Sequence, residues 1–342
     1  MNTVLQFWRE RYGIDRPLES DSRLSRMLNR YVVAGLMNTF PKTVTKVLSL
    51  SRGEFSRLLF IEKERGSYKS LRAMYDYEDP RNRGDLINRV LMQAPAVKAA
   101  RNRRKIAQDM LRRCLETQPS GSPVLVLAVG GGDGRLEAEV LARVARHDVY
   151  YCGVDKDERA IEEIQKCLAE HGLAGKGFVY LGDAAEKSDL LAAVDSAERR
   201  FGVRFGGASI AVCHGITEYL DIGADTNDTL SCLLTAIHGC MRTEGSLIIS
   251  QTDYHDRVKW LERGLSWYMR LRSIDELATE VEKAGWQISV CEHEPMRLIT
   301  MCLAVKSAAK HLRIDSPSRL RQSRTPGRVP ATAGRHGLAE HQ

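Results

Sequence analysis

Between residues 123 and 306, short apolar runs alternate with stretches that have helical periodicity. The apolar runs are Val124–Val129, Val149–Val154, Phe178–Leu181, Ala208–Cys213, Ser246–Thr252, Gln287–Cys291 and Leu298–Val305. The helical patterns begin near Arg135, Lys156, Ala184, Asn227 and Ile274. Strand–helix alternation at this spacing predicts an α/β fold with a largely parallel sheet that is covered on both faces. The last two runs have no helix between them, so we expect them to pair antiparallel as a hairpin.

The remaining sequence predicts two further parts on either side of the sheet. Residues 1–116 are typical of helices, because segments such as Arg52–Lys63 and Pro95–Glu116 carry apolar residues at helical spacing. Residues 117–123 are turn-forming and predict a boundary. From about residue 312 the chain is rich in Ser, Pro, Arg and Gly, which favours disorder. We therefore expect a helical region over 1–116, an α/β domain over 117–311 and a disordered basic tail over 312–342.

Charge is distributed unevenly around a formal net charge of +7. Residues 1–120 contain 24 Lys and Arg against 13 Asp and Glu, whereas residues 121–312 contain 21 against 29. A basic front could attract nucleic acid or an anionic surface, although a solvated helical face has the same composition. No apolar run approaches the ~18 residues that span a bilayer, and the start lacks a signal-peptide pattern. We therefore expect a cytoplasmic protein without a membrane partner.

The eight cysteines are scattered and form no CxxC pair. This pattern predicts neither a metal site nor a disulfide framework, and it favours reduced thiols.

A glycine-rich loop follows the first predicted strand. Val129 leads into Gly130-Gly131-Gly132-Asp133-Gly134, and a helical pattern begins directly afterwards. The carboxyl end of a strand is where open α/β sheets bind ligands, and glycine lets a ligand approach the backbone closely. The dinucleotide pattern GxGxxG fails because Arg135 and Glu137 stand where its third glycine would be, and no Gly-Lys-Ser/Thr follows. The loop therefore suits a ligand such as a nucleoside that carries an amino acid.

Two acidic residues follow the next two predicted strands. Asp155 ends the second strand, where a carboxylate can accept hydrogen bonds from both hydroxyls of a ribose. Asp183 ends the third strand, where a carboxylate can accept from the exocyclic amine of adenine. Either residue alone could be a helix cap. Their combination with the glycine loop indicates a nucleoside site.

These motifs resemble those of the class I S-adenosylmethionine-dependent methyltransferases, over about residues 95–306. The resemblance implies a Rossmann-like sheet of seven strands, with S-adenosyl-L-methionine as cofactor and S-adenosyl-L-homocysteine as product. The fourth predicted strand ends in Val212–Gly215, where the family faces the sulfonium. Ala128 departs from the family, which has an acidic residue there. The implied cofactor residues are Gly130, Gly131, Gly132, Gly134, Asp155, Lys156, Asp183, Ala184, Cys213 and His214, with Arg103 for the carboxylate of the cofactor.

A narrower resemblance joins three further segments to a group of bacterial methyltransferases of undefined substrate, in which a helical region also precedes the cofactor domain. These segments are His214–Leu220, Gln251–His255 and Arg270–Leu277. The resemblance places candidate functional residues after the fourth and fifth strands. We expect His214, Glu218, Asp253 and His255 to act in catalysis, and Tyr219, Tyr254, Trp267 and Tyr268 to contact substrate. Each of these residues also has an ordinary structural reading, as a capping group, a surface carboxylate or a core aromatic.

The function that this resemblance implies is methyl transfer to a nitrogen or oxygen of a small molecule. Carboxylates at the site favour an amine- or guanidine-bearing metabolite of a biosynthetic pathway, whereas a histidine suits a phenol or carboxyl oxygen. The alternatives are an RNA or protein methyltransferase and a cofactor-binding module without catalysis. Cys213-His214-Gly215-Ile216 differs from the motif that methylates base amines, so nucleic acid is disfavoured. We expect the N-terminal helices to cap the site; their alternative role is to join two copies into a homodimer.

Overall fold

The computed structural model describes residues 3–12, 17–77, 84–144, 146–222, 229–255 and 257–307. Residues 1–308 form one compact unit. The division predicted at residue 116 stays a prediction. The predicted tail over 312–342 lies outside the described residues.

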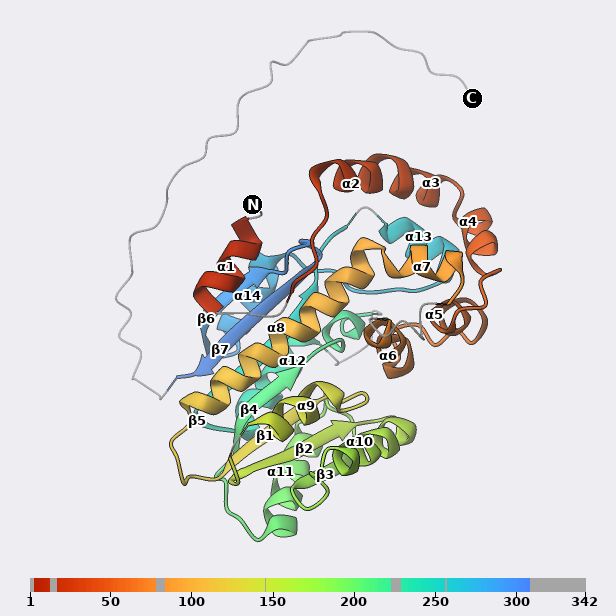
Figure 1. Ribbon diagram of the computed structural model, residues 1–342. Helices are drawn as coiled ribbons and strands as arrows, with labels where there is room; N and C mark the ends of the chain where they lie inside the picture. Colours follow the sequence, from red (N-terminus) through yellow and green to blue (C-terminus); the bar gives the residue numbers. More distant parts are fainter. Residues whose placement is uncertain are drawn as a thin grey trace, which may run out of the picture. The chain divides into compact units, whose positions relative to one another are not determined.

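The core of the fold is a seven-stranded sheet with the order β3-β2-β1-β4-β5-β7-β6 (Figure 1). The strands are β1 (Val124–Val129), β2 (Val149–Asp155), β3 (Gly177–Leu181), β4 (Ala208–Cys213), β5 (Met241–Thr252), β6 (Trp286–His293) and β7 (Ile299–Lys306). The first five strands are parallel, and β7 is antiparallel to both β5 and β6. The predicted α/β fold with a final antiparallel hairpin is therefore confirmed. The strand order reverses between β1 and β4, where ligands bind in such sheets.

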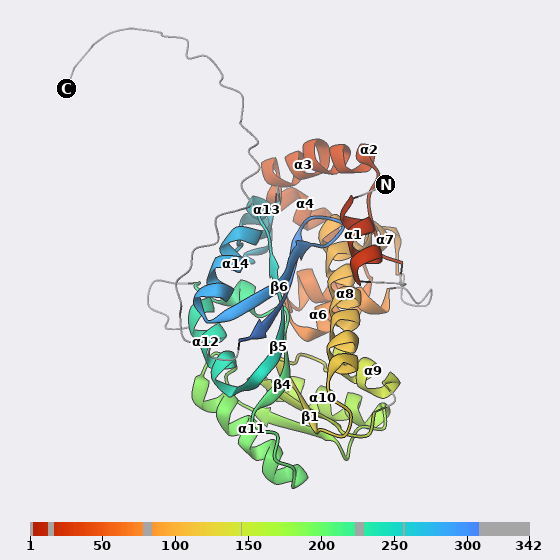
Figure 2. The same ribbon diagram turned by 90° about the vertical axis from the view of Figure 1, so that its left-hand side faces the viewer.

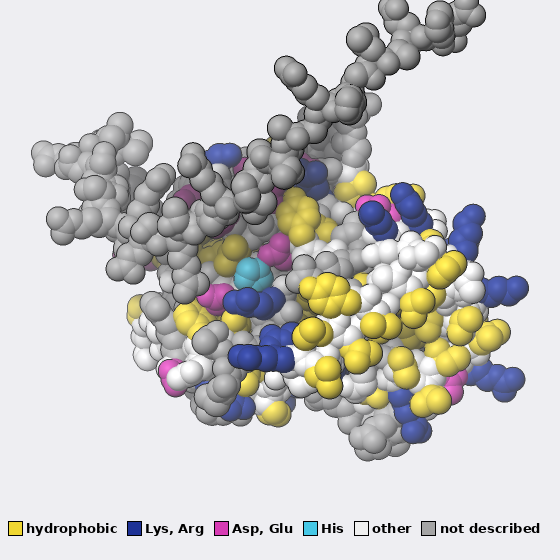
Figure 3. Space-filling view, turned by 90° about the horizontal axis from the view of Figure 1, so that it is seen from above, with side chains coloured by type: hydrophobic (Ala, Val, Ile, Leu, Met, Phe, Trp, Pro, Cys, Tyr) yellow, Lys and Arg dark blue, Asp and Glu magenta, His cyan; other side chains and the backbone are white. Residues whose placement is uncertain are grey.

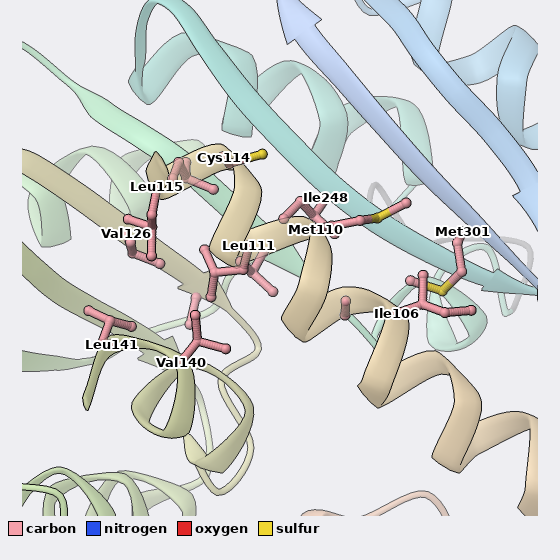
Figure 4. Packing of buried hydrophobic residues seen from close by; sticks show 14 of the residues in the cluster. Ile106, Met110, Leu111, Cys114, Leu115, Val126, Val140, Leu141, Ile248 and Met301 are labelled. Carbon is pink, nitrogen blue, oxygen red and sulfur yellow. The ribbon is translucent and has the colours of Figure 1, made fainter. Parts of the chain in front are cut away.

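Helices cover both faces of this sheet (Figure 2). One face carries α8 (Pro95–Thr117), α9 (Arg135–Arg143) and α10 (Glu158–Glu170), and the other carries α11 (Lys187–Phe201), α12 (Leu230–Cys240) and α14 (Ile274–Lys283). Successive residues of β1 point to opposite faces, so Val126 joins the first core and Leu127 the second. Figure 4 shows how Ile106, Met110 and Leu111 of α8 lie along the sheet. This long helix therefore ties the N-terminal region to the sheet.

The remaining N-terminal helices form a smaller layer with its own core. They are α2 (Arg23–Met27), the π-helical η1 (Leu28–Val33), α3 (Ala34–Thr39), α4 (Pro41–Leu48), α5 (Glu54–Ser56), the π-helical η2 (Arg57–Ile61), α6 (Tyr68–Asp76) and α7 (Leu86–Met92). Their core includes Phe55, Leu59 and Met92, together with Trp260 and Leu265 of α13 (Val258–Leu265). α13 lies between β5 and α14 in the chain and was not among the predicted helices. The first helix, α1 (Thr3–Tyr12), instead packs on the sheet through Trp8.

Candidate active site

The glycine loop makes a tight turn between β1 and α9. Gly130, Gly132 and Gly134 all have positive φ, between 60° and 67°, which other residues rarely adopt. The amides of Gly130 and Gly131 donate to the carbonyl of Val154 at 2.9 and 3.1 Å, so the loop is anchored to β2. A Cβ at Gly134 would lie 3.1 Å from Cγ2 of Ile164, so a larger residue would push the loop away from α10. The loop geometry therefore depends on glycine in both conformation and space.

The two predicted nucleoside carboxylates lie at adjacent strand ends. Asp155 accepts a hydrogen bond from the amide of Gly132 at 3.0 Å on one oxygen and from the amide of Asp157 at 3.0 Å on the other. Asp183 accepts from the amide of Ala185 at 2.9 Å, and Lys156 Nζ lies 3.3 Å from its second oxygen. Each carboxylate oxygen has two lone pairs, so these contacts leave acceptor capacity on both residues. The glycine loop, Asp155, Lys156 and Asp183 are thus brought together, with Ala184 buried in the core behind them.

His214 follows β4 and is held as a neutral imidazole. Its Nδ1 lies 3.0 Å from Oγ of Ser250, and its buried Nε2 has no hydrogen-bond partner among the described residues. Burial and the nearby Arg103 cation lower the pKa of His214 to about 3. A side chain with this pKa is a weak base, but it can hold a ligand group by a hydrogen bond. Burial also raises the pKa of the adjacent Cys213 thiol, so Cys213 is protonated and unreactive.

A buried ion pair connects α8 to the segment after β4. Nη1 of Arg103 lies 3.6 Å from Oε1 of Glu218, and both side chains are almost fully buried. Glu218 also accepts hydrogen bonds from Thr252 at 2.7 Å and from Thr217 at 3.3 Å. These contacts fix the Glu218 carboxylate at the carboxyl ends of β4 and β5. The sequence did not predict that Arg103, expected to bind the cofactor, and Glu218, expected to act in catalysis, would be in contact.

Beside this ion pair lies a cavity of about 160 Å³ between the N-terminal helices and the strand ends. Its walls are almost entirely apolar and include Phe55, Leu59 and Met74 from the helices. Trp267 and Tyr219 also line it, and Trp267 Nε1 donates to the Tyr219 hydroxyl at 3.2 Å. Its polar side chains are Arg103, Glu218, Tyr219, Thr252, His255, Arg257 and the two Trp indoles. The predicted residues Arg103, Glu218, Tyr219, His255 and Trp267 therefore meet at one cavity.

Three predicted site residues point elsewhere. Asp253 lies 2.6 Å from Nε2 of His293, a partner forty residues away that the local sequence does not reveal. Tyr254 and Tyr268 are 57% and 58% exposed and do not line the cavity. The alternating residues of a loop after a strand face different directions, and that direction depends on tertiary packing.

Helix α6 contributes contacts that were not predicted from the sequence. A Cβ at Gly132 would lie 3.6 Å from Cβ of Tyr68, so this tyrosine stands over the glycine loop. The helix is clamped there by two ion pairs, Asp76 with Arg135 at 2.7 Å and Arg72 with Glu163 at 2.9 Å. The apolar periodicity of α6 could reveal a buried face, but no sequence signal identifies which partner it covers.

Two features are absent from the described residues. No group of three or more His, Cys, Asp or Glu side chains in these ranges is placed to hold a metal ion. Among the helices of the described ranges, none combines the length and apolar character needed to cross a membrane.

Comparison with known proteins identifies relatives of this chain. A family model described as "Putative methyltransferase" matches residues 65–306. "Uncharacterized protein YnbC" of Escherichia coli (strain K12) is 22% identical over 232 residues, which cover 65% of this chain and 37% of that protein. The chain therefore spans little more than a third of the length of this curated relative.

Solved structures are also similar to this chain. A "possible exported protein" from Bordetella parapertussis is 18% identical, with a TM-score of 0.60, and the alignment covers 84% of this chain and 100% of that one. The Burkholderia thailandensis 1,6-didemethyltoxoflavin-N1-methyltransferase, solved with S-adenosylhomocysteine, is 17% identical, with a TM-score of 0.40, over 70% of this chain and 89% of that one. The family match includes the glycine loop and all seven strands and covers well over half of the sequence, so this chain belongs to that methyltransferase family.

Proposed function

We propose that the protein transfers a methyl group from S-adenosyl-L-methionine to a nitrogen or oxygen of a small molecule with a largely apolar body. The observation that carries this proposal is the apolar cavity, which has Glu218 among its lining residues. Ligand sites are typically apolar with a few convergent polar groups. The cavity walls favour an apolar body, to which the amine or guanidine group suggested by the carboxylates could be attached.

The residues at the first three strand ends fit the cofactor. Asp155 has lone pairs for the ribose hydroxyls, and Asp183 has lone pairs for the adenine amine. The buried Nε2 of His214 is without a hydrogen-bond partner among the described residues, and a buried polar atom of this kind normally meets a ligand or water. When bound, the cofactor supplies a methyl group that is already activated on a sulfonium. The assignment of Arg103 to its carboxylate stays a prediction, beside the contact of Arg103 with Glu218.

The chain has two tasks in this reaction: it must orient the acceptor and take up its proton. Glu218 is the proposed proton acceptor for a hydroxyl or a protonated amine, since it lines the cavity and its carboxylate is fixed by Thr252. His214 remains neutral, and its Nε2 is the proposed hydrogen-bonding partner of a polar group of the cofactor. The apolar walls exclude water, which would otherwise solvate the nucleophile.

The test is transfer of a radiolabelled methyl group from the cofactor, catalysed by the full chain in an extract that contains metabolites, protein and RNA. We expect label in the fraction that organic solvent extracts. The Glu218→Gln variant should lower the rate by about 10²–10⁴-fold while binding the cofactor as the wild type does. Glu282→Gln, an exposed carboxylate on α14, is the matched control. Label in RNA or protein alone would favour the macromolecular alternative, and label in no fraction would favour the non-catalytic one.

A further inference from the structure

The outer face of the N-terminal helical layer exposes a stripe of apolar side chains. Leu24, Met27, Leu28, Tyr31, Val32 and Leu36 recur at helical spacing through α2, η1 and α3, and each is at least half exposed. Phe40, Val47 and Leu50 extend the exposed apolar surface along and beyond α4. A stripe with this spacing is normally the buried face of a helix. Exposed patches of this kind mark sites of protein or membrane interaction.

Hydrogen bonds to α13 and to the residue before it fix the orientation of this layer. Asn29 accepts a hydrogen bond from Arg257 at 3.1 Å, and Asn38 accepts one from the amide of Trp260 at 3.0 Å. Thr45 donates to the carbonyl of Gly264 at 3.3 Å. Three polar side chains of the layer thus face α13, while the apolar side chains of the stripe face outward. Rotating the layer to bury the stripe would break all three contacts.

The charged side chains on the helices of the stripe are all basic, and Glu262 of α13 lies beside Phe40 and Lys42. Between Asp21 and Glu54 the sequence has six Lys or Arg residues and no Asp or Glu. Lys42 and Lys46 lie exposed on α4, and Arg23 and Arg26 lie exposed on α2. Figure 3 shows hydrophobic side chains interspersed with many Lys and Arg and with a few Asp and Glu over this side of the molecule. Apolar side chains with a basic rim are typical of helices that lie in the interface of an anionic membrane.

We propose that the outer face of α2, η1, α3 and α4 docks on the surface of an anionic lipid bilayer. A second copy of the chain fits less well, because both faces would be predominantly basic and would repel each other. The segment beyond residue 308 also fits less well, because it is itself basic. RNA is disfavoured because the exposed side chains between the basic residues are mainly aliphatic, and aliphatic side chains do not stack on bases.

The docking face and the active-site cavity share one layer of helices. α3 contributes Met37 to the cavity wall and Leu36 to the exposed stripe. α13, which holds this layer in place, contributes Trp260, Leu261 and Leu265 to the cavity. Docking would therefore place an apolar cavity next to the phase in which an apolar substrate dissolves. The link between docking and an apolar substrate rests on the proposed function, whereas the docking itself does not.

The experiment is co-sedimentation of the full chain with two kinds of vesicle, one of phosphatidylcholine and one of equal parts phosphatidylcholine and phosphatidylglycerol. We expect binding to the second kind only, and weaker binding at high salt. The variants Leu24→Gln/Leu28→Gln and Lys42→Glu/Lys46→Glu should each lower the vesicle partition coefficient at least tenfold. The matched controls Leu181→Gln/Leu191→Gln and Arg199→Glu/Arg200→Glu change exposed residues of the same types on β3 and α11, away from this face (Figure 1), and should bind as the wild type does.

Three results would overturn the docking proposal: no binding of the wild type to anionic vesicles, equal binding by all variants, or a stable dimer that the Leu24→Gln/Leu28→Gln variant dissociates. Calorimetry with the cofactor on the same variants separates this question from the proposed function. A variant that loses vesicle binding but keeps its cofactor affinity supports docking. A variant that loses both is misfolded. In that case the single variant Leu36→Gln replaces it, and the same two measurements, vesicle binding and cofactor affinity, decide the question.

Discussion

The carboxylate of Asp155 joins the glycine loop to the second strand end, and we expect it to dominate cofactor affinity. Replacing Asp155 with Ala removes the charge-assisted hydrogen bonds that the ribose hydroxyls would make, each worth about 1–3 kcal/mol. Titration calorimetry with S-adenosyl-L-methionine should show an affinity at least tenfold lower. Asp195→Ala, an exposed carboxylate on α11, is the control. Because Asp155 also accepts from the Gly132 amide, Asp155→Asn should keep the loop and still lose affinity. Wild-type affinity in both variants would refute the ribose assignment.

Glu137 of α9 is buried below the glycine loop, and burial raises its pKa to about 8. Between its unfolded pKa near 4.5 and the folded value, the folded chain keeps the proton and the unfolded chain releases it. The free energy of unfolding therefore falls as pH rises through this window. Glu137→Gln removes the titration, so we expect it to stabilise the protein by up to about 3 kcal/mol at pH 7 and hardly at all at pH 4.5.

Urea denaturation at both pH values, with Glu186→Gln as an exposed control, measures this difference. A gain in stability that is independent of pH would show that Glu137 is ionised in the folded protein.

At the same scale, the sequence placed Asp155 and Asp183 at the carboxyl edge of the sheet, because a residue that ends or closely follows a parallel strand must lie there; their role in binding the cofactor stays a prediction. It did not identify the partner of Asp253, because His293 comes from another strand. The cavity side chains Phe55 and Met74 were predictable only as buried residues. Tertiary packing brings them to the site, and the local sequence carries no signal for it.

The elements of the sheet were predicted more closely than those of the N-terminal layer. Strands such as β1 and β4 are continuous apolar runs between turn residues, so their bounds follow from the sequence itself. β5 begins five residues earlier than predicted, at Met241, because that residue pairs with Ala208 before an irregularity in the ladder. α13 was missed, and α5 continues into the π-helical η2, because packing around Trp260 outweighs the short local patterns.

Helix α8 presents small side chains to the cavity, and their size limits the volume available to the methyl acceptor. Ala96, Ala99, Ala100 and Arg103 lie at i, i+3, i+4 and i+7, and all of them line the cavity. Ala100→Leu adds three carbon atoms to this wall, and the cavity has space for them without strain in the core. We expect methyl transfer to the extractable acceptor to fall at least tenfold through a higher KM, with cofactor affinity and melting temperature retained.

Ala169→Leu on the exposed face of α10 is the matched control for this substitution. An unchanged KM in the Ala100→Leu variant would place the acceptor outside the cavity.

Over the whole molecule, the compact unit ends with β7, and we expect stability to depend on this strand and not on the segment after it. The sequence beyond Ser307 contains no Phe, Trp or Tyr, so it adds little to a core. A chain that ends at Ser307 should keep its melting temperature to within about 1 °C, because a loss of 1 kcal/mol would already shift it by about 2–4 °C.

A chain that ends at Leu303 is the matched comparison, because it also loses the last three residues of β7. Ala304 is fully buried and pairs with Leu247 of β5. Lys306 Nζ donates to the carbonyls of His238 and Met241, both at 2.7 Å, and so ties the strand end to the end of α12. Losing these hydrogen bonds and the buried side chains should cost several kcal/mol, or a fall of about 5 °C or more in differential scanning calorimetry. A similar fall in the chain that ends at Ser307 would instead show that the segment beyond it docks on the folded unit.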